Sequence, residues 1–135
     1  MVDVNELPVR IHVRSKDNLF RVESEAVRIG TDVLVYLWGG ERPHIGSVAV
    51  AQSRPSLADP ARTSATASVI TFPGHKEDVL VKEAAERIAS ELDVHVVVTA
   101  GIHWDDLNEE GIKAIMANSR EVVDKLLQRL KSGDV

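Results

Sequence analysis

The fold is decided by SATASVITFPGHKEDVLVKEAAERIASELDVHVVVTA, the stretch that runs from residue 64 to residue 100. The period of its apolar residues changes from two to about 3.6 at the Pro-Gly pair of positions 73–74. This change predicts a strand over 64–72, a helix from about 75 to 92 and a short apolar strand over 94–100. Two strands joined through a crossover helix are expected to run parallel, with a right-handed connection.

The residues before this stretch are strand-like. Apolar and polar side chains alternate over 9–13 and again over 20–29. Residues 32–38 are apolar on both alternating faces, which is typical of a central strand, and 45–52 is predicted to form one more strand. The segment 53–62 contains two prolines, so we expect it to be an ordered loop or a mobile flap.

A second helix follows the last strand. It is predicted to begin near Asp106, because Asp106 and Glu109 have the spacing of a capping box, with Asp in place of Ser or Thr. The resulting order, β-β-β-β-β-α-β-α, predicts a single α/β (α+β) domain over residues 1–135. It should contain a mixed sheet of about six strands, with both helices in the C-terminal half. The buried stripe of the second helix should consist of apolar residues at helical spacing: Ile112, Ile115, Met116, Val122, Val123, Leu126, Leu127 and Leu130.

The composition of the chain argues against several classes of function. The chain has 135 residues, 44% of them hydrophobic, and no cysteine, which excludes disulfide scaffolds and thiolate metal sites. Its net charge of −5 argues against broad nucleic-acid binding, which needs a positive surface. The N-terminal sequence MVDVNELPVRIHV does not resemble a signal peptide, and no apolar run approaches the ~18 residues of a membrane span. We therefore expect a cytoplasmic protein that binds neither nucleic acid nor membrane.

The expected topology gathers three loops at one edge of the sheet. If the two strands of the crossover unit are parallel, the loops 73–76 and 101–104 leave the same end of the sheet, and each leads into a helix N-terminus. An antiparallel strand over 45–52 would start at that end too, which brings 42–46 into the same neighbourhood. Ligands of open α/β sheets bind at this kind of edge.

The chemistry of the predicted edge suits an anion. Helix N-termini present unpaired N–H groups and about half a positive charge. Gly74 and Gly101 allow the backbone to approach a ligand closely, while Lys76, Arg42 and protonated histidines add donors. A nearby tryptophan could cover a flat ring. Together with the helix N-termini and the cationic donors, it fits a phosphate-bearing aromatic cofactor better than a simple sugar.

The two tryptophans and two of the five histidines can also be explained without a ligand. Trp38 or Trp104 could cover a flat ring, but we expect Trp38 to lie in the core, because its predicted strand is central. His12 and His95 alternate with apolar neighbours, so we expect them to be structural or to face solvent.

Three segments in this order carry a resemblance to a known family. They are RPHIGSVAVA (42–51), PGHKED (73–78) and TAGIH (99–103). Together they resemble the prenylated-flavin chaperones of the LpdD type, which accompany gallate-decarboxylase-like enzymes of the UbiD class. The resemblance covers about residues 8–130.

The resemblance implies a fold related to the proteasome-assembly chaperones, usually in a homodimer. It implies a role in binding prenylated FMN and in protecting it or delivering it to an apo-decarboxylase of the UbiD class. It carries the cofactor-binding function to the motif residues His44, Gly46, Gly74, His75, Lys76, Gly101 and His103.

Two alternatives stay open beside this hypothesis. His44, His75 and His103 could hold zinc with an open position for water, which would make a metal-dependent enzyme, although the chain has no HExxH spacing. A ligand-free assembly scaffold is the other alternative, and a conspicuous apolar surface would favour it.

Overall fold

The computed structural model describes residues 9–72 and 77–133. Within these residues the chain forms six strands and two helices in the predicted order. In chain order they are β1 (Arg10–Arg14), β2 (Val22–Ile29), β3 (Asp32–Gly40), β4 (Ser47–Pro55), β5 (Thr63–Thr71), α1 (Asp78–Leu92), β6 (Val96–His103) and α2 (Glu109–Ser132).

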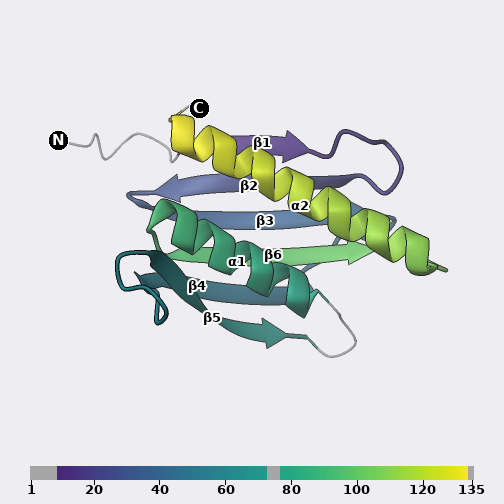
Figure 1. Cartoon of the computed structure of the whole chain (residues 1–135). Helices are drawn as coiled ribbons and strands as arrows, with labels where there is room; N and C mark the ends of the chain where they lie inside the picture. Colours follow the sequence, from purple (N-terminus) through teal and green to yellow (C-terminus); the bar gives the residue numbers. More distant parts are fainter. Residues whose placement is uncertain (1–8, 73–76, 134–135) are drawn as a thin grey trace.

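The six strands form one mixed sheet in the order β1-β2-β3-β6-β4-β5 (Figure 1). Only β3 and β6 pair in parallel, and every other neighbouring pair is antiparallel. Because β5 and β6 are both antiparallel to β4, which lies between them, they run parallel to each other. The predicted fold class and the predicted direction of these two strands are therefore confirmed.

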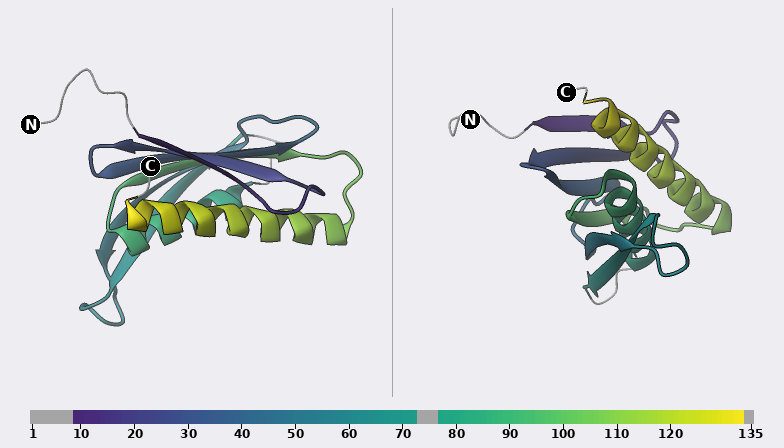
Figure 2. Two further views of the ribbon diagram at one scale, coloured as in Figure 1. Left: turned by 90° about the horizontal axis from the view of Figure 1, so that it is seen from above. Right: turned by 60° about the vertical axis from the view of Figure 1, so that its left-hand side comes forward.

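Both helices lie on one face of the sheet (Figure 2). Helix α1 packs on β4, β5 and β6, and α2 packs on β1 and β2. Their apolar stripes meet the inward side chains of the strands in one core, which includes Val35, Leu37, Ile88, Val98 and Leu126. In the described part of the chain, neither helix is long and apolar enough to cross a membrane.

The start of α2 differs from the prediction. Asn108, not Asp106, is the N-cap: its side-chain oxygen accepts from the Gly111 N–H at 2.8 Å. Asp106 lies in a turn before the helix, with a left-handed φ of 55°. The later start also changes the buried stripe. Gly111 and Ser119 are buried, whereas Ile112 is 51% exposed, contrary to the prediction.

Strands β4 and β6 extend beyond their predicted C-terminal ends. Strand β4 continues to Pro55, which pairs with Thr63, so the connecting loop is shortened to 56–62. Strand β6 continues through Gly101 to His103. Gly101 therefore lies inside a strand rather than ending one.

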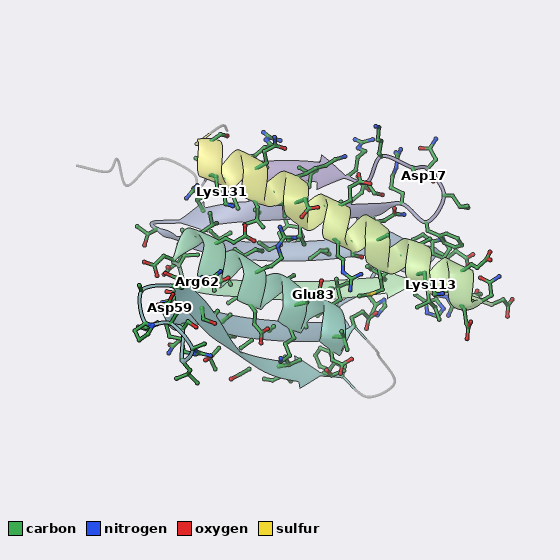
Figure 3. All side chains as sticks on the ribbon, in the orientation of Figure 1. Asp17, Asp59, Arg62, Glu83, Lys113 and Lys131 are labelled. Atoms are coloured by element: carbon green, nitrogen blue, oxygen red, sulfur yellow. The ribbon has the colours of Figure 1, made fainter. Side chains whose placement is uncertain are left out.

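Charged side chains join the two helices on the outer side of the molecule, where Glu83 and Lys131 are visible in Figure 3. Arg120 binds Glu83 at 2.8 Å and Lys131 binds Glu91 at 2.7 Å, each from α2 to α1. Arg87 on α1 binds Asp124 on α2 at 2.6 Å. The outer helical face is thus charged, and the opposite face of the sheet is not covered by either helix.

Candidate functional site

The predicted gathering of loops at one sheet edge is confirmed for 42–46 and 101–103. Strand β4 begins at Ser47, which pairs with Thr71 at the end of β5 and with Ala100 near the end of β6. The Gly46 N–H donates to the Ala100 carbonyl at 2.9 Å, and the Gly46 carbonyl accepts from the Phe72 N–H at 2.9 Å. These backbone bonds fix the loop after β3 against the ends of both strands.

Two of the predicted site residues are glycines that permit close packing. A Cβ on Gly101 would lie 1.5 Å from the His44 carbonyl oxygen, so only glycine lets the loop cross β6 at this point. A Cβ on Gly46 would lie 2.3 Å from Oε2 of Glu77. Gly101 is therefore required for the loop to pass at His44, and Gly46 leaves open the space that the Glu77 carboxylate occupies.

His44 and Glu77 form a largely buried pair at the centre of this edge. Their Nε2 and Oε1 atoms lie 3.1 Å apart, and the side chains are 23% and 11% exposed. The other ring nitrogen of His44, Nδ1, lies 2.9 Å from the Arg42 carbonyl oxygen. Since a carbonyl only accepts, Nδ1 carries a hydrogen in this contact. The His44 ring is thus held between the Arg42 carbonyl and the Glu77 carboxylate.

Glu77 is a residue that the sequence reasoning missed. It is absent from the predicted cofactor-binding set, but besides facing His44 its Oε1 accepts from the Ile102 N–H at 3.2 Å. It stands at the N-cap of α1 without making a side-chain capping bond. Its position inside the PGHKED motif was the available signal, whereas a contact between residues 44 and 77 cannot be read from spacing alone.

His103 binds a different carboxylate from His44. Its Nε2 lies 2.9 Å from Oδ1 of Asp105, and Arg42 contacts the same carboxylate at 2.9 and 3.2 Å. Hydrogen bonds from His103 first and Arg42 second lower the pKa of Asp105 below its ordinary value. The structure therefore places His44 and His103 at one edge but engages them in separate pairs.

The remaining predicted site residues, Gly74, His75 and Lys76, lie outside the described residues. Among residues 9–72 and 77–133, no group of three or more histidines and carboxylates is arranged to hold a metal ion. The part of the three-histidine hypothesis that the structure describes thus consists of two histidines, each paired with its own acid.

A hollow of about 550 Å³ opens beside His44 on the sheet face that the helices leave uncovered. Trp38 and Tyr36 lie in its wall as near-parallel rings, with centroids 5.6 Å apart and planes at 27°. Trp38 therefore faces outward and is not in the core, contrary to the prediction, because both helices pack on the other face. The hollow is lined by Glu25, Leu34, Tyr36, Leu37, Trp38, Pro43, His44, Ile45 and Thr99.

The structure also places Trp104, His12 and His95. Trp104 packs edge-on against Phe20, with centroids 5.3 Å apart, and is partly buried against the core. The side chains of His12 and His95 are 45% and 71% exposed, which confirms that they face solvent. His12 also stacks on the side of Trp38 at 5.6 Å.

The fold and this edge of the sheet define a small α+β domain with both helices on one face of a six-stranded mixed sheet. The family model described as prenylated flavin chaperone LpdD-like domain matches residues 16–131. The chain belongs to this family, and the resemblance inferred from the three motifs is confirmed.

One similar protein and one similar solved structure support this assignment. Protein LpdD of Lactiplantibacillus plantarum is 26% identical over 112 residues, which cover 79% of this chain and 75% of that protein. A chain from the crystal structure of a chaperone complex for yeast 20S proteasome assembly has the same fold, with a TM-score of 0.56 and 13% identity. The match covers 96% of this chain and 100% of that one. The predicted relation to proteasome-assembly chaperones is thus confirmed at the level of fold.

Proposed function

We propose that this protein is a non-catalytic carrier that binds prenylated FMN, protects it and delivers it to a decarboxylase of the UbiD class. The observation that carries the proposal is the family match over residues 16–131, joined to a hollow of about 550 Å³ beside the motif residue His44. That volume lies within the range of small-molecule sites, about 300–1,000 Å³. Aromatic walls with a few polar groups suit a planar heterocycle.

The proposed cofactor site lies along the loop edge. His44 and His103 would bond the polar edge of the flavin or stabilise its anionic reduced form, and Gly46 and Gly101 allow the loop to close over the strand ends. Residues from the segment outside the described chain would complete the site. The whole proposed set is His44, Gly46, Gly74, His75, Lys76, Gly101 and His103.

The phosphate of the cofactor would be held by Lys76 and the N-terminus of α1. Helix N-termini favour anions, but Glu77 already places a carboxylate there. Its Oε2 is buried and has no hydrogen-bond partner in the described part of the chain. A phosphate there would lie beside the Glu77 carboxylate, so Lys76 would have to offset the charge of both groups.

The partners follow from the same proposal. A carrier must release its cofactor, so it would meet a UbiD-type decarboxylase through an accessible surface. We also propose a homodimer, because Val50 and Ile70 on the uncovered face are 54% and 74% exposed. Exposed apolar side chains of this size mark interaction surfaces when they are grouped.

The test is an anaerobic titration of the purified protein with reduced prenylated FMN, with plain FMN as the control, followed by absorbance and native mass spectrometry. Saturable binding that prefers the prenylated form is expected. Replacing His75 and Lys76 together by alanine should weaken binding by at least ~2 kcal/mol, because hydrogen bonds to charged groups contribute ~1.5–3 kcal/mol each.

A matched control is Lys82→Ala, which removes a lysine that pairs with Glu86 one turn further along α1. It should leave binding unchanged. If the His75/Lys76 variant binds as tightly as the parent, the phosphate assignment is wrong. If neither flavin binds to the parent protein, the carrier function itself is wrong.

A second candidate, a ligand-free assembly scaffold, is favoured by the exposed apolar side chains of the uncovered face, including Ile45 at 61% exposure. The two functions differ in their dependence on flavin. A scaffold would bind the apo-decarboxylase equally well with and without the cofactor, whereas a carrier would bind it more tightly when loaded.

A further inference from the structure

We propose that Trp38 and Tyr36 form the surface on which the planar ring of the flavin lies, with His44 at the edge of that ring. This inference rests on the proposed function and adds to it a binding surface outside the three family motifs. Both residues belong to β3, whereas the motifs supply the loops at the sheet edge and parts of β4 and β6.

The aromatic surface is a row of near-parallel rings. Tyr36 and Trp38 project from the same side of β3, since they are two residues apart in one strand. The ring of His12 from β1 also stacks on Trp38, at a centroid distance of 5.6 Å and an angle of 26°. Both neighbouring rings are thus near-parallel to Trp38, on a face that carries no helix.

The row ends against the loop that carries His44. Trp38 pairs with Gly101 of β6, and a side chain on Gly101 would strike the His44 carbonyl. The loop therefore crosses the sheet immediately beside the Trp38 ring. In the left view of Figure 2, this loop rises on the side of the sheet opposite the helices. Pro43, His44 and Ile45 then form a wall of the hollow.

This arrangement fits a flat molecule with apolar faces and a polar edge. Trp38 and Tyr36 line the hollow with aromatic surface against which a planar heterocycle can pack, and packing of this kind tolerates any planar ring. Polar groups are few and lie at the rim. The Tyr36 hydroxyl donates to Glu25, and the Thr99 hydroxyl donates to the Ser47 carbonyl at 3.0 Å. His44 is the titratable group that a ring on this surface would meet at the loop.

A single-stranded nucleic acid would also stack on aromatic rings, but this face carries charges of both signs. Glu23 and Glu25 of β2 flank Trp38 and Tyr36 in the sheet register, and they pair with Arg14 and Arg10 of β1. Nucleic-acid platforms combine stacking with a positively charged groove. The observations therefore favour a small cofactor.

The experiment compares four proteins in the same anaerobic titration with reduced prenylated FMN: the parent, Trp38→Leu, Trp38→Phe and Ile29→Ala. Trp38→Leu keeps an apolar side chain but removes the ring, and it should weaken binding about tenfold or more. Trp38→Phe restores a ring and should bind within about threefold of the parent. Ile29→Ala removes a 57% exposed apolar side chain at the opposite end of the same face and should change nothing.

Two spectroscopic readings distinguish stacking from a general loss of structure. In the parent, binding should shift the flavin absorption band and quench flavin fluorescence, and both effects should be reduced in Trp38→Leu even at saturation. Far-ultraviolet circular dichroism checks the fold of each variant. Should Trp38→Leu fail to fold, Tyr36→Leu takes its place with the same expectations.

Each outcome separates this inference from the carrier function. If the parent binds and Trp38→Leu binds equally well with an unchanged spectrum, the ring does not lie on this surface, while the carrier function stands. The same conclusion follows if Trp38→Leu alters only the molecular mass in solution, because a second copy then covers the rings. If the parent itself binds no flavin, both proposals are wrong.

Discussion

At the scale of single residues, Gly101 is the position where the loop and the sheet meet most closely. An added Cβ would lie 1.5 Å from a backbone atom, the His44 carbonyl oxygen, which no side-chain rotation can relieve. We expect Gly101→Ala to lower the free energy of unfolding by more than ~3 kcal/mol, since the loop must be displaced. Gly30→Ala is the matched control. With φ at +63° and no atom within 4 Å, it should cost only ~1 kcal/mol of strain. Urea denaturation measures both, and equal losses would contradict the close approach.

The second prediction at this scale concerns the His44–Glu77 pair. Glu77→Ala leaves the Ile102 N–H without its acceptor and removes the carboxylate that lies 3.1 Å from Nε2 of His44, so stability should fall by ~1–3 kcal/mol. Glu77→Gln keeps an amide oxygen for the Ile102 N–H and should cost less. Asp78→Ala, at the exposed neighbouring acid in the first turn, should cost about 0.5 kcal/mol. A Glu77→Ala variant as stable as Asp78→Ala in urea denaturation would show that the pair does not fix the edge.

At the scale of elements, substitutions can distinguish Asn108 from Asp106 as the N-cap of α2. Asn108→Ala removes the acceptor of the Gly111 N–H and should lower stability by ~1 kcal/mol. Asp106→Gly should leave stability unchanged or slightly raised, because glycine adopts the left-handed φ of 55° without strain. Thermal unfolding followed by circular dichroism measures both variants. The reverse result would place the start of the helix at Asp106.

The ion pairs between the helices give a pH dependence at the same scale. Hydrogen bonds from Lys131 first and Arg87 second hold the pKa of Glu91 below its ordinary value of 4.5. A carboxyl whose pKa is lowered in the folded state stabilises the fold above its unfolded pKa and loses that effect as the pH falls through its folded pKa. Lys131→Met should therefore cost less than ~1 kcal/mol at pH 7, and the difference from the parent should shrink below pH 4.5. Urea unfolding over a pH series tests this. Lys113→Met, near the other end of α2 in Figure 3, should show no such trend.

At the scale of the whole molecule, hydrophobic period and topology explain which predictions succeeded. The change of period after residue 72 located the crossover unit, and its parallel strands brought 42–46 and 101–103 together, as the structure confirms. The environment of Trp38 could not be predicted, because residues 32–38 are apolar on both faces and only packing decides which face the helices cover. The partnership of His44 with Glu77 depends on how the loop crosses β6. That crossing is set by tertiary contacts at Gly46 and Gly101, and local sequence does not encode it.

The last prediction concerns assembly, because the two helices leave one whole face of the sheet uncovered. Val50 on β4 and Ile70 on β5 project from that face, two and three strands away from Trp38 on β3, so a second copy can cover them without filling the hollow. We expect a homodimer in solution, which Ile70→Asp should convert to a monomer, because burying an unpaired carboxylate in an apolar contact is costly. Leu57→Asp, at a 90% exposed position in the 56–62 loop, should stay dimeric. Light scattering after size exclusion at several concentrations measures the mass. A parent protein that is monomeric throughout would show that the uncovered face serves another partner or the cofactor alone.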